Sequence, residues 1–362
     1  MKTRSTILLI GVALVISLGA GFGEPARADG REPSRTALMV FVDYEDRVEP
    51  SLPVSDLRLG GASGLGDWLE GQGHEVLTYP EIEPIMRAWQ IRSALDLPYN
   101  LLPALGAEHS IDYLMIVRLV LYPDRVLLLG RGLARNSGYL CWASTVEISL
   151  PSEFWIQEEG TAEAWNNLIA TASAQFTAHW PDAASETPGS TLVLLPLRPV
   201  GLGSESADIA THSILGSLLE TKLWQIPDPA MVRSVLRDGG HDPRRLDEAG
   251  RAELSIWFDP VALLVPNLLS FETLVTRAVP FVVEDAAPTK VALAAEAKVP
   301  LYLQVLLLDC GTGRVRSAMA AYLKPDDPTG LFGFDKTVPL ARRFEFGADQ
   351  IVEKLKRTGG KI

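Results

Sequence analysis

Cysteine is nearly absent from this sequence, which has two, Cys141 and Cys310, among 362 residues. Two cysteines are too few for the disulfide framework that holds many small exported domains together. The sequence does not decide whether the two thiols come within bonding distance of each other. The fold must therefore rest on apolar packing, and 47% hydrophobic residues supply enough material for about two domains.

Basic residues are also scarce. The chain has 33 Lys and Arg against 45 Asp and Glu, a formal net charge of −12. No block of Lys and Arg offsets this excess. Binding to nucleic acid or to an anionic membrane surface is therefore not expected.

The one uncharged apolar run near the start, Ile7 to Leu18, follows Lys2 and Arg4 and precedes Ala26-Arg27-Ala28. This order is typical of a signal peptide with its cleavage site, which predicts residues 1–28 as a signal peptide and a periplasmic location. Without them the formal charge is −14. A retained membrane anchor is the alternative, although the run is short for a bilayer span. No cysteine near the cleavage point could carry a lipid.

The rest of the chain contains the same order of patterns twice. We expect a first domain over 29–180, a linker over 181–190 and a second domain over 191–362, with an insertion over 273–299. The linker is small, polar and bounded by proline. The identity between the two halves is low, so the repeat is inferred from the pattern.

Each half predicts an α/β (α+β) domain: an opening strand, two helical regions, three strands and a closing helix. The opening strands, 36–43 and 191–197, are apolar on both faces, so each should lie inside its sheet. We expect three or four strands in a mixed sheet, with the helices on one face and an antiparallel hairpin before the closing helix. The glycine-rich stretches 59–66 and 201–206 are predicted as loops.

The second hairpin holds the stretch "DCGTG", Asp309 to Gly313, between two strand patterns. Its small residues suit the positive φ of a tight turn. The first half has Arg135-Asn-Ser-Gly138 at the matching place, without a cysteine. Because no histidine lies within fifty residues of Cys310 to activate it, we interpret this stretch as a turn rather than a nucleophilic site.

This hairpin, "LQVLLLDCGTGRVRSA", is similar to one in the amino-terminal domain of TolB and in curli-secretion-channel (CsgG-type) domains. The strand "TLVLLPLRPVG" and the stretch "ALGAEHSIDYLMIVRLV" resemble further motifs of the same class. The chain departs from it in the insertion, in Pro266 within the middle strand and in lacking the lipid-anchor cysteine. The resemblance implies two tandem periplasmic domains that act through protein contacts and have no catalytic residues.

No group of residues indicates chemistry. The five histidines have no metal-ligand spacing along the chain, and "GLGSES" (201–206) lacks the third glycine of a dinucleotide fingerprint. A helix N-cap at Ser204 or Ser206 explains that stretch more simply. We therefore expect no enzyme activity, no cofactor and no metal.

Candidate partner contacts are aromatic or lie in the insertion: Trp142, Trp155, Phe281 and Val283. The core is the simpler place for each tryptophan. The second half alone has the insertion, and a long extra loop in a compact domain is often a binding element.

These patterns favour an accessory or scaffold protein of envelope assembly or transport, which binds other envelope proteins or copies of itself. Two alternatives stay open. One is a periplasmic ligand-binding protein with a cleft between the halves, and the other is a subunit of a secretion-channel-type oligomer. No strong membrane insertion is expected after signal cleavage.

Overall fold

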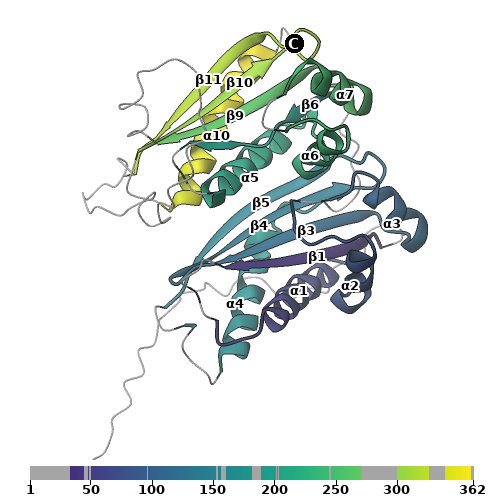
Figure 1. The fold of residues 1–362 in the computed structure, drawn as a ribbon. Coiled ribbons are helices and arrows are strands. Elements are labelled where there is room, and N and C mark those ends of the chain that lie inside the picture. The colour runs from purple at the N-terminus through teal and green to yellow at the C-terminus, as the bar shows by residue number, and fades with distance from the viewer. Residues whose placement is uncertain are drawn as a thin grey trace, which may run out of the picture. The chain divides into compact units, whose positions relative to one another are not determined.

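Two mixed β-sheets with their helices form the architecture of this computed structural model (Figure 1). The structure describes residues 33–44, 48, 50–95, 97–151, 154–155, 160–181, 189–200, 202, 204–243, 246–270, 300–325 and 339–359. Pro33–Ile362 forms one compact unit. The predicted signal peptide and the insertion 273–299 lie outside the described residues.

The first half runs from β1 to α4, and its elements are β1 (Arg35–Tyr44), α1 (Val54–Gly71), β2 (Glu75–Leu77), α2 (Tyr79–Ala88), α3 (Leu101–His109), β3 (Tyr113–Leu121), β4 (Arg125–Ala134), β5 (Leu140–Ser149) and α4 (Thr161–Phe176). The second half runs from β6 to α10, and its elements are β6 (Ser190–Leu194), β7 (Arg198–Val200), α5 (Ser204–Glu220), β8 (Trp224–Gln225), α6 (Pro229–Asp238), α7 (Glu248–Phe258), β9 (Ala262–Ser270), β10 (Leu301–Leu308), β11 (Val315–Leu323) and α10 (Leu340–Gly359).

Both sheets have the same topology. The strand order is β2-β1-β3-β4-β5 in the first and β11-β10-β9-β6-β8 in the second, where β7 also pairs with β9. The opening strand of each half pairs in parallel with its neighbours, and the last three strands are antiparallel. The predicted fold class and hairpins are confirmed, and both opening strands lie inside their sheets. Short parallel strands, β2 and β8, raise each sheet above the expected three or four strands.

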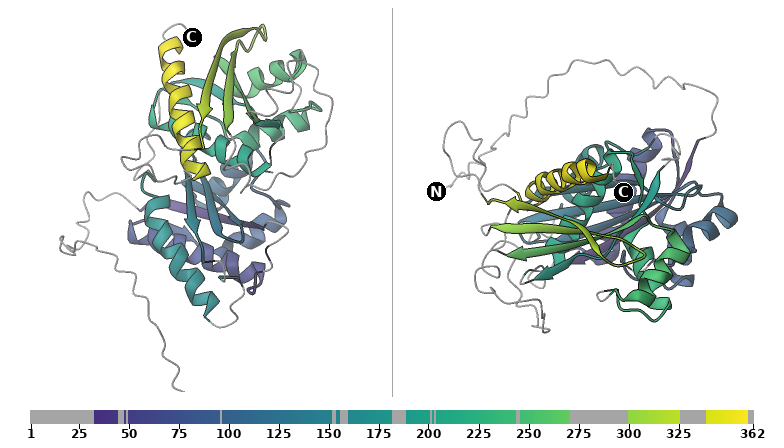
Figure 2. Two further views of the ribbon diagram at one scale, coloured as in Figure 1. Left: turned by 90° about the vertical axis from the view of Figure 1, so that its left-hand side faces the viewer. Right: turned by 90° about the horizontal axis from the view of Figure 1, so that it is seen from above.

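The expectation of helices on one face is wrong, because the first sheet is covered on both. The side chains of Leu38 and Val40 pack in a core with α1 and α4. Those of Ala37 and Met39 point the other way, into a core that continues through α5 and α10 to the second sheet. Figure 1 shows α5 between β5 and the strands of the second sheet, and Figure 2 shows α10 alongside β10 and β11. Apolar opening strands with two buried faces require such a double cover.

The glycine-rich stretch 59–66 is helical, which corrects the loop prediction. It lies inside α1, where Gly60 faces Trp165 and Gly64 faces Ile169 of α4. A Cβ on either glycine would come within 3.0 Å of these side chains. Close packing of two helices explains the glycines, so tertiary contact outweighs their low helix propensity.

Pro266 lies within β9 without ending it. Its neighbour on one side is interrupted instead, because β6 pairs up to Leu264 and β7 resumes at Asn267. Proline has no N–H to donate, and the break in the partner strand falls opposite it.

Candidate interaction surface

The "DCGTG" stretch forms the predicted turn between β10 and β11. The carboxylate of Asp309 accepts hydrogen bonds from the Thr312 amide at 2.7 Å and from Arg316 Nε at 3.0 Å, and Gly313 has φ of 67°. The Thr312 amide and the Arg316 guanidinium lower the pKa of Asp309 to about 2. This carboxylate therefore stays ionised as the organiser of the turn.

Neither thiol is in an activating environment. Cys310 is buried, and its Sγ lies 3.2 Å from Ser255 Oγ. Desolvation raises the pKa of Cys141 to about 12, so this thiol is protonated at neutral pH. Both cysteines are unpaired.

The other residues that the sequence offered as candidates, the serines of α5 and the possible metal ligands, do not form one site. Ser204 is the first residue of α5, and Ser206 is fully buried in its first turn. The described residues contain no cluster of three or more His, Cys, Asp or Glu side chains that could hold a metal ion. Within the same part of the chain, no helix has the length and apolar character needed to cross a bilayer.

Trp142 and Trp155, two of the predicted partner contacts, are core residues with 2% and 5% of their surface exposed. Trp142 packs edge-on against Phe176, and the Trp155 indole N–H donates to the Tyr122 carbonyl at 2.8 Å. These contacts account for both rings without a partner. Phe281 and Val283 lie outside the described residues.

Two arginines on the first sheet bind the second half. Arg131 of β4 forms a buried ion pair with Asp228, which also caps α6 by accepting from the Ala230 amide at 2.6 Å. Arg118 of β3 is paired with Asp208 of α5. Because removal of one partner would leave a buried charge uncompensated, these pairs hold the two halves together specifically.

His212 of α5 lies in the same layer and is 5% exposed. Its Nδ1 is 2.8 Å from the Asp208 carbonyl. Desolvation, and then the charge of Arg131, lower its pKa to about 3. This imidazole is therefore neutral at physiological pH and serves the packing of the junction rather than acid–base chemistry.

The two sheets can be aligned through equivalent hydrogen bonds: the Asp112 amide donates to the Arg35 carbonyl, and the Val261 amide to that of Thr191. Following the strand registers from these bonds places Asn267 where the first sheet has Arg118. The same registers place Leu306 where it has Arg131. The second sheet thus has no cation at either position.

This comparison points to the outer face of the second sheet. Helices α6 and α7 pack on this face near Val265 and Leu308, whereas in the part of the chain that the structure describes Ala318, Ala320 and Tyr322 are exposed on it. We define the outer face by the side chains of β9, β10 and β11 that point away from α5 and α10 and lie outside the α6 and α7 cluster: Asn267, Leu269, Tyr302, Gln304, Leu306, Ala318, Ala320 and Tyr322. None of them is charged. Tyr322 is 38% exposed and stacks on Tyr302 at 4.8 Å between ring centroids, while Ala318 and Ala320 are also exposed.

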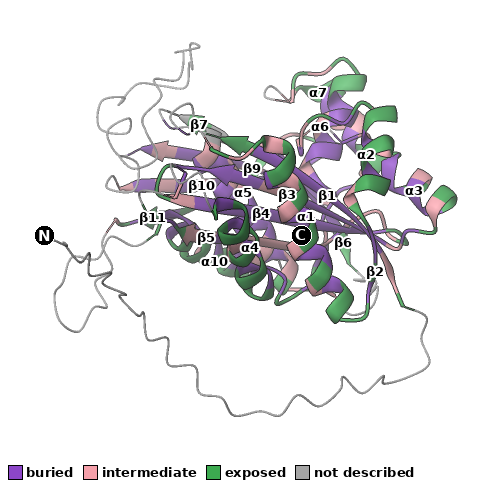
Figure 3. Ribbon diagram, turned by 90° about the horizontal axis from the view of Figure 1, so that it is seen from below, coloured by how far each residue is buried: buried purple, intermediate pink, exposed green. Residues whose placement is uncertain are grey.

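The burial pattern sets this face apart from the other strands. Figure 3 shows strands that are mostly buried, with exposed residues gathered on the helices. In β11 exposed Ala318 and Ala320 alternate with buried Met319 and Ala321. A sheet that is covered on one face only has this alternation. Sequence reasoning missed it because both sets of side chains are apolar.

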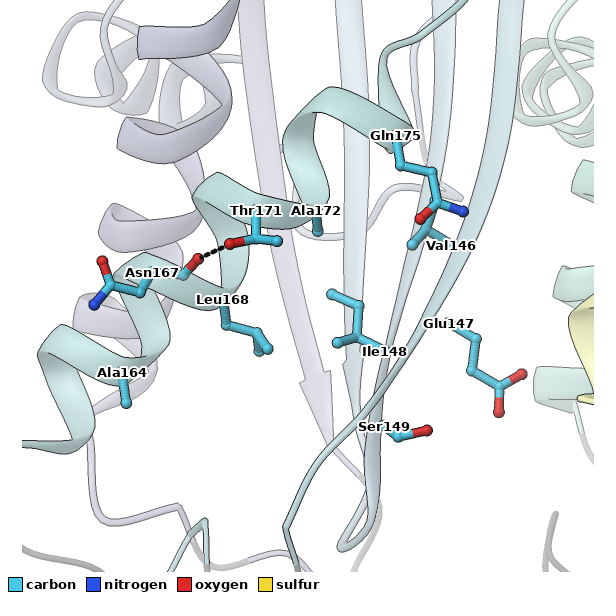
Figure 4. A pocket seen from close by; sticks show the side chains of 10 residues that line it. All are labelled: Val146, Glu147, Ile148, Ser149, Ala164, Asn167, Leu168, Thr171, Ala172 and Gln175. Atoms are coloured by element: carbon cyan, nitrogen blue, oxygen red, sulfur yellow. Dashed lines mark hydrogen bonds between the residues drawn. The ribbon is translucent and has the colours of Figure 1, made fainter. Parts of the chain in front are cut away.

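A groove of about 440 Å³ opens between β5 and α4 (Figure 4). Ile148 and Leu168 lie on its two sides. Helix α4 packs mainly against α1 and only partly against β5. The equivalent helix of the second half, α10, packs directly on β11, with Gly347 against Leu323. Glu147 is the one ionisable residue among the described residues that line it, and desolvation raises the pKa of this carboxyl.

Comparison with protein-family models gives no match, and no curated protein is significantly similar. Several solved structures are similar at low identity. The lipoprotein GNA1162 of Neisseria meningitidis is 13% identical over 41% of this chain and 100% of its own, with a TM-score of 0.29. The LpoB C-terminal domain of Salmonella enterica is 12% identical over 34% of this chain and 88% of its own, with a TM-score of 0.25.

A PelC dodecamer from Paraburkholderia phytofirmans is 14% identical over 40% of this chain and 89% of that chain, with a TM-score of 0.24. Similarity at these TM-scores decides neither the family nor the function. The resemblance to TolB and CsgG-type domains stays a hypothesis.

Proposed function

We propose that this chain is a non-enzymatic accessory or scaffold protein of a bacterial envelope, which binds other proteins through the outer face of the second sheet. One observation carries the proposal. The equivalent face of the first sheet is buried under α5, whereas on the second sheet the described helices α6 and α7 reach this face at Val265 and Leu308 and leave Ala318, Ala320 and Tyr322 exposed. Exposed apolar side chains on an uncharged face are typical of protein interaction sites.

Location in the envelope follows from the predicted signal peptide. The absence of enzyme activity is proposed from the protonated Cys141, the neutral His212 and the structural role of Asp309. None of these groups has the environment of a nucleophile or a general base at neutral pH.

The alternative of a ligand cleft between the halves gains no support. One hydrophobic core includes Leu129 of the first sheet, Leu215 of α5 and Leu303 of the second sheet. The Leu140 amide also donates to the Ile226 carbonyl across the junction at 2.9 Å. Continuous packing of this kind leaves the halves joined rather than hinged around a ligand.

The test is affinity purification of the full-length protein from its native envelope, with an Ala320→Glu variant and an Ala170→Glu control. Ala170 is exposed on α4, far in the sequence from the outer face. The native and control proteins should recover the same partner, and Ala320→Glu should recover at most a tenth as much. Equal recovery by all three proteins would show that the outer face is not the contact.

A further inference from the structure

The first half shows what covers this face when it is buried. Helix α5 lies directly on β4 and β5. A Cβ on Gly216 of α5 would lie 3.5 Å from the Ala143 carbonyl oxygen of β5, an ordinary van der Waals contact. Ala143 is small and partly buried in the shared core. Helix α5 therefore packs on this face with a glycine, Gly216, next to a small strand residue, Ala143.

The second sheet keeps the small residue at the same place. Ala143 pairs with Arg131, and the equivalent pair on the second sheet is Ala318 with Leu306. One register step further, Ala320 stands where the first sheet has Thr145. Small side chains on an edge strand leave room for a helix backbone to approach closely.

The charges differ between the face of the first sheet that binds α5 and the equivalent face of the second sheet. In the first sheet Arg118 and Arg131 bind the acidic residues Asp208 and Asp228 of the covering half. The second sheet has Asn267 and Leu306 at these positions, so an acidic group brought there would be desolvated without a cation. The occupant must present an uncharged surface.

We propose that the outer face of the second sheet binds an amphipathic α-helix of a partner protein, seated over Ala318 and Ala320 as α5 is seated over β5. The helix has a small, uncharged apolar stripe toward the sheet, the groove-binding mode of amphipathic helices. This inference rests on the proposed function, since it specifies the partner of the same surface.

A second copy of this chain is a poorer occupant through its first-half helices. The exposed side of α1 carries Asp56, Asp67 and Glu70. Stacking α1 on the outer face would place these carboxylates near an uncharged surface.

Site-specific photo-crosslinking of the full-length protein in its native envelope tests the inference. A benzophenone side chain replaces Ala318 or Ala320 in two separate proteins, and Ala170 in the control protein. Both outer-face probes should crosslink to one partner segment, at residues spaced by three or four, and the control should not.

Crosslinks at alternate residues would indicate a strand and overturn the helix, while the proposed function would stand. Crosslinks to the same protein, with a dimer in light scattering, would identify a second copy and overturn the partner helix. Recovery of a partner without any outer-face crosslink would overturn both the helix and the surface.

Two further variants test helix binding at Ala318 separately from the stability of the fold. Ala318→Trp should fill the space proposed for the partner helix and lower partner recovery at least tenfold, whereas Ala318→Ser should retain normal recovery. Circular dichroism and the unfolding midpoint should stay unchanged in both, because the residue is exposed. Retention of the partner by Ala318→Trp would contradict the proposal that a helix packs over Ala318.

Discussion

The two sheets differ in charge and in cover on one pair of equivalent faces, the face of β3 and β4 in the first half and that of β9 and β10 in the second. In the first half Arg118 and Arg131 emerge from that face and meet Asp208 and Asp228 of the second half. In the second half the same register positions are Asn267 and Leu306. The same order of elements thus produces an internal junction in one half and, among the described residues, a face with exposed strand residues in the other. The arginines at these two strand positions distinguish the face that packs against another part of the same chain.

The largest effect should come from breaking the buried pair. Asp228→Ala leaves Arg131 buried without its partner and also removes the α6 cap, so we expect a loss of about 3–5 kcal/mol in the free energy of unfolding. Urea denaturation measures it. Asn267→Ala at the equivalent place of Arg118 is the control, with less than about 0.5 kcal/mol.

The double variant Arg131→Leu, Asp228→Leu makes the first sheet resemble the second at this position. It should be far less destabilised than Asp228→Ala, because two apolar side chains need no charge compensation. A loss below about 1 kcal/mol in Asp228→Ala itself would show that the pair does not hold the junction.

Acid should weaken the junction through His212. The unfolded chain binds a proton at this residue near pH 6.5, whereas the folded pKa is about 3. The folded state is therefore disfavoured as pH falls from about 6.5 toward 3, by roughly 4 kcal/mol from this residue alone at pH 3.5. Unfolding free energies at several pH values should show this slope, and His212→Gln should flatten it. An unchanged slope in His212→Gln would assign the acid sensitivity to other groups.

A carboxylate should be tolerated on one sheet and not on the other. Thr145 and Ala320 occupy equivalent positions. The hydroxyl of Thr145 is buried and has no hydrogen-bond partner among the described residues, whereas Ala320 is exposed. Thr145→Glu should therefore lower the unfolding free energy by about 2 kcal/mol and Ala320→Glu by less than about 0.5 kcal/mol. Equal losses would mean that Ala320 is covered as Thr145 is.

The smallest effect should come from glycines in two helices, Gly347 of α10 and Gly71 of α1. Gly347→Ala places a Cβ against Leu323 Cδ2 and should push α10 from β11, which lowers the free energy of unfolding by about 1–2 kcal/mol. Gly71→Ala, with no atom within 4 Å of the added Cβ, should be neutral or stabilising by up to about 1 kcal/mol. Thermal unfolding can rank the two variants. A stabilised Gly347→Ala would show that α10 has room to move.

The sequence by itself determined the local elements. Apolar runs defined the interior strands, and Asp309 with Gly313 defined the turn because their conformations are set by neighbours in the chain. It misled at 59–66, where glycines that usually end a helix lie inside α1 because Trp165 and Ile169 of α4 pack against them.

Only the tertiary structure decided which apolar surface is buried. Met39 and Ala37 look no different in sequence from the apolar residues of β10. A second layer of helices buries the first set, whereas in the described part of the chain Ala318, Ala320 and Tyr322 of the outer face remain exposed. The ion pair between Arg131 and Asp228 joins residues 97 positions apart. Hydrophobic burial and charge pairing depend on distance in space, and periodicity along a chain reports only which side chains share a face.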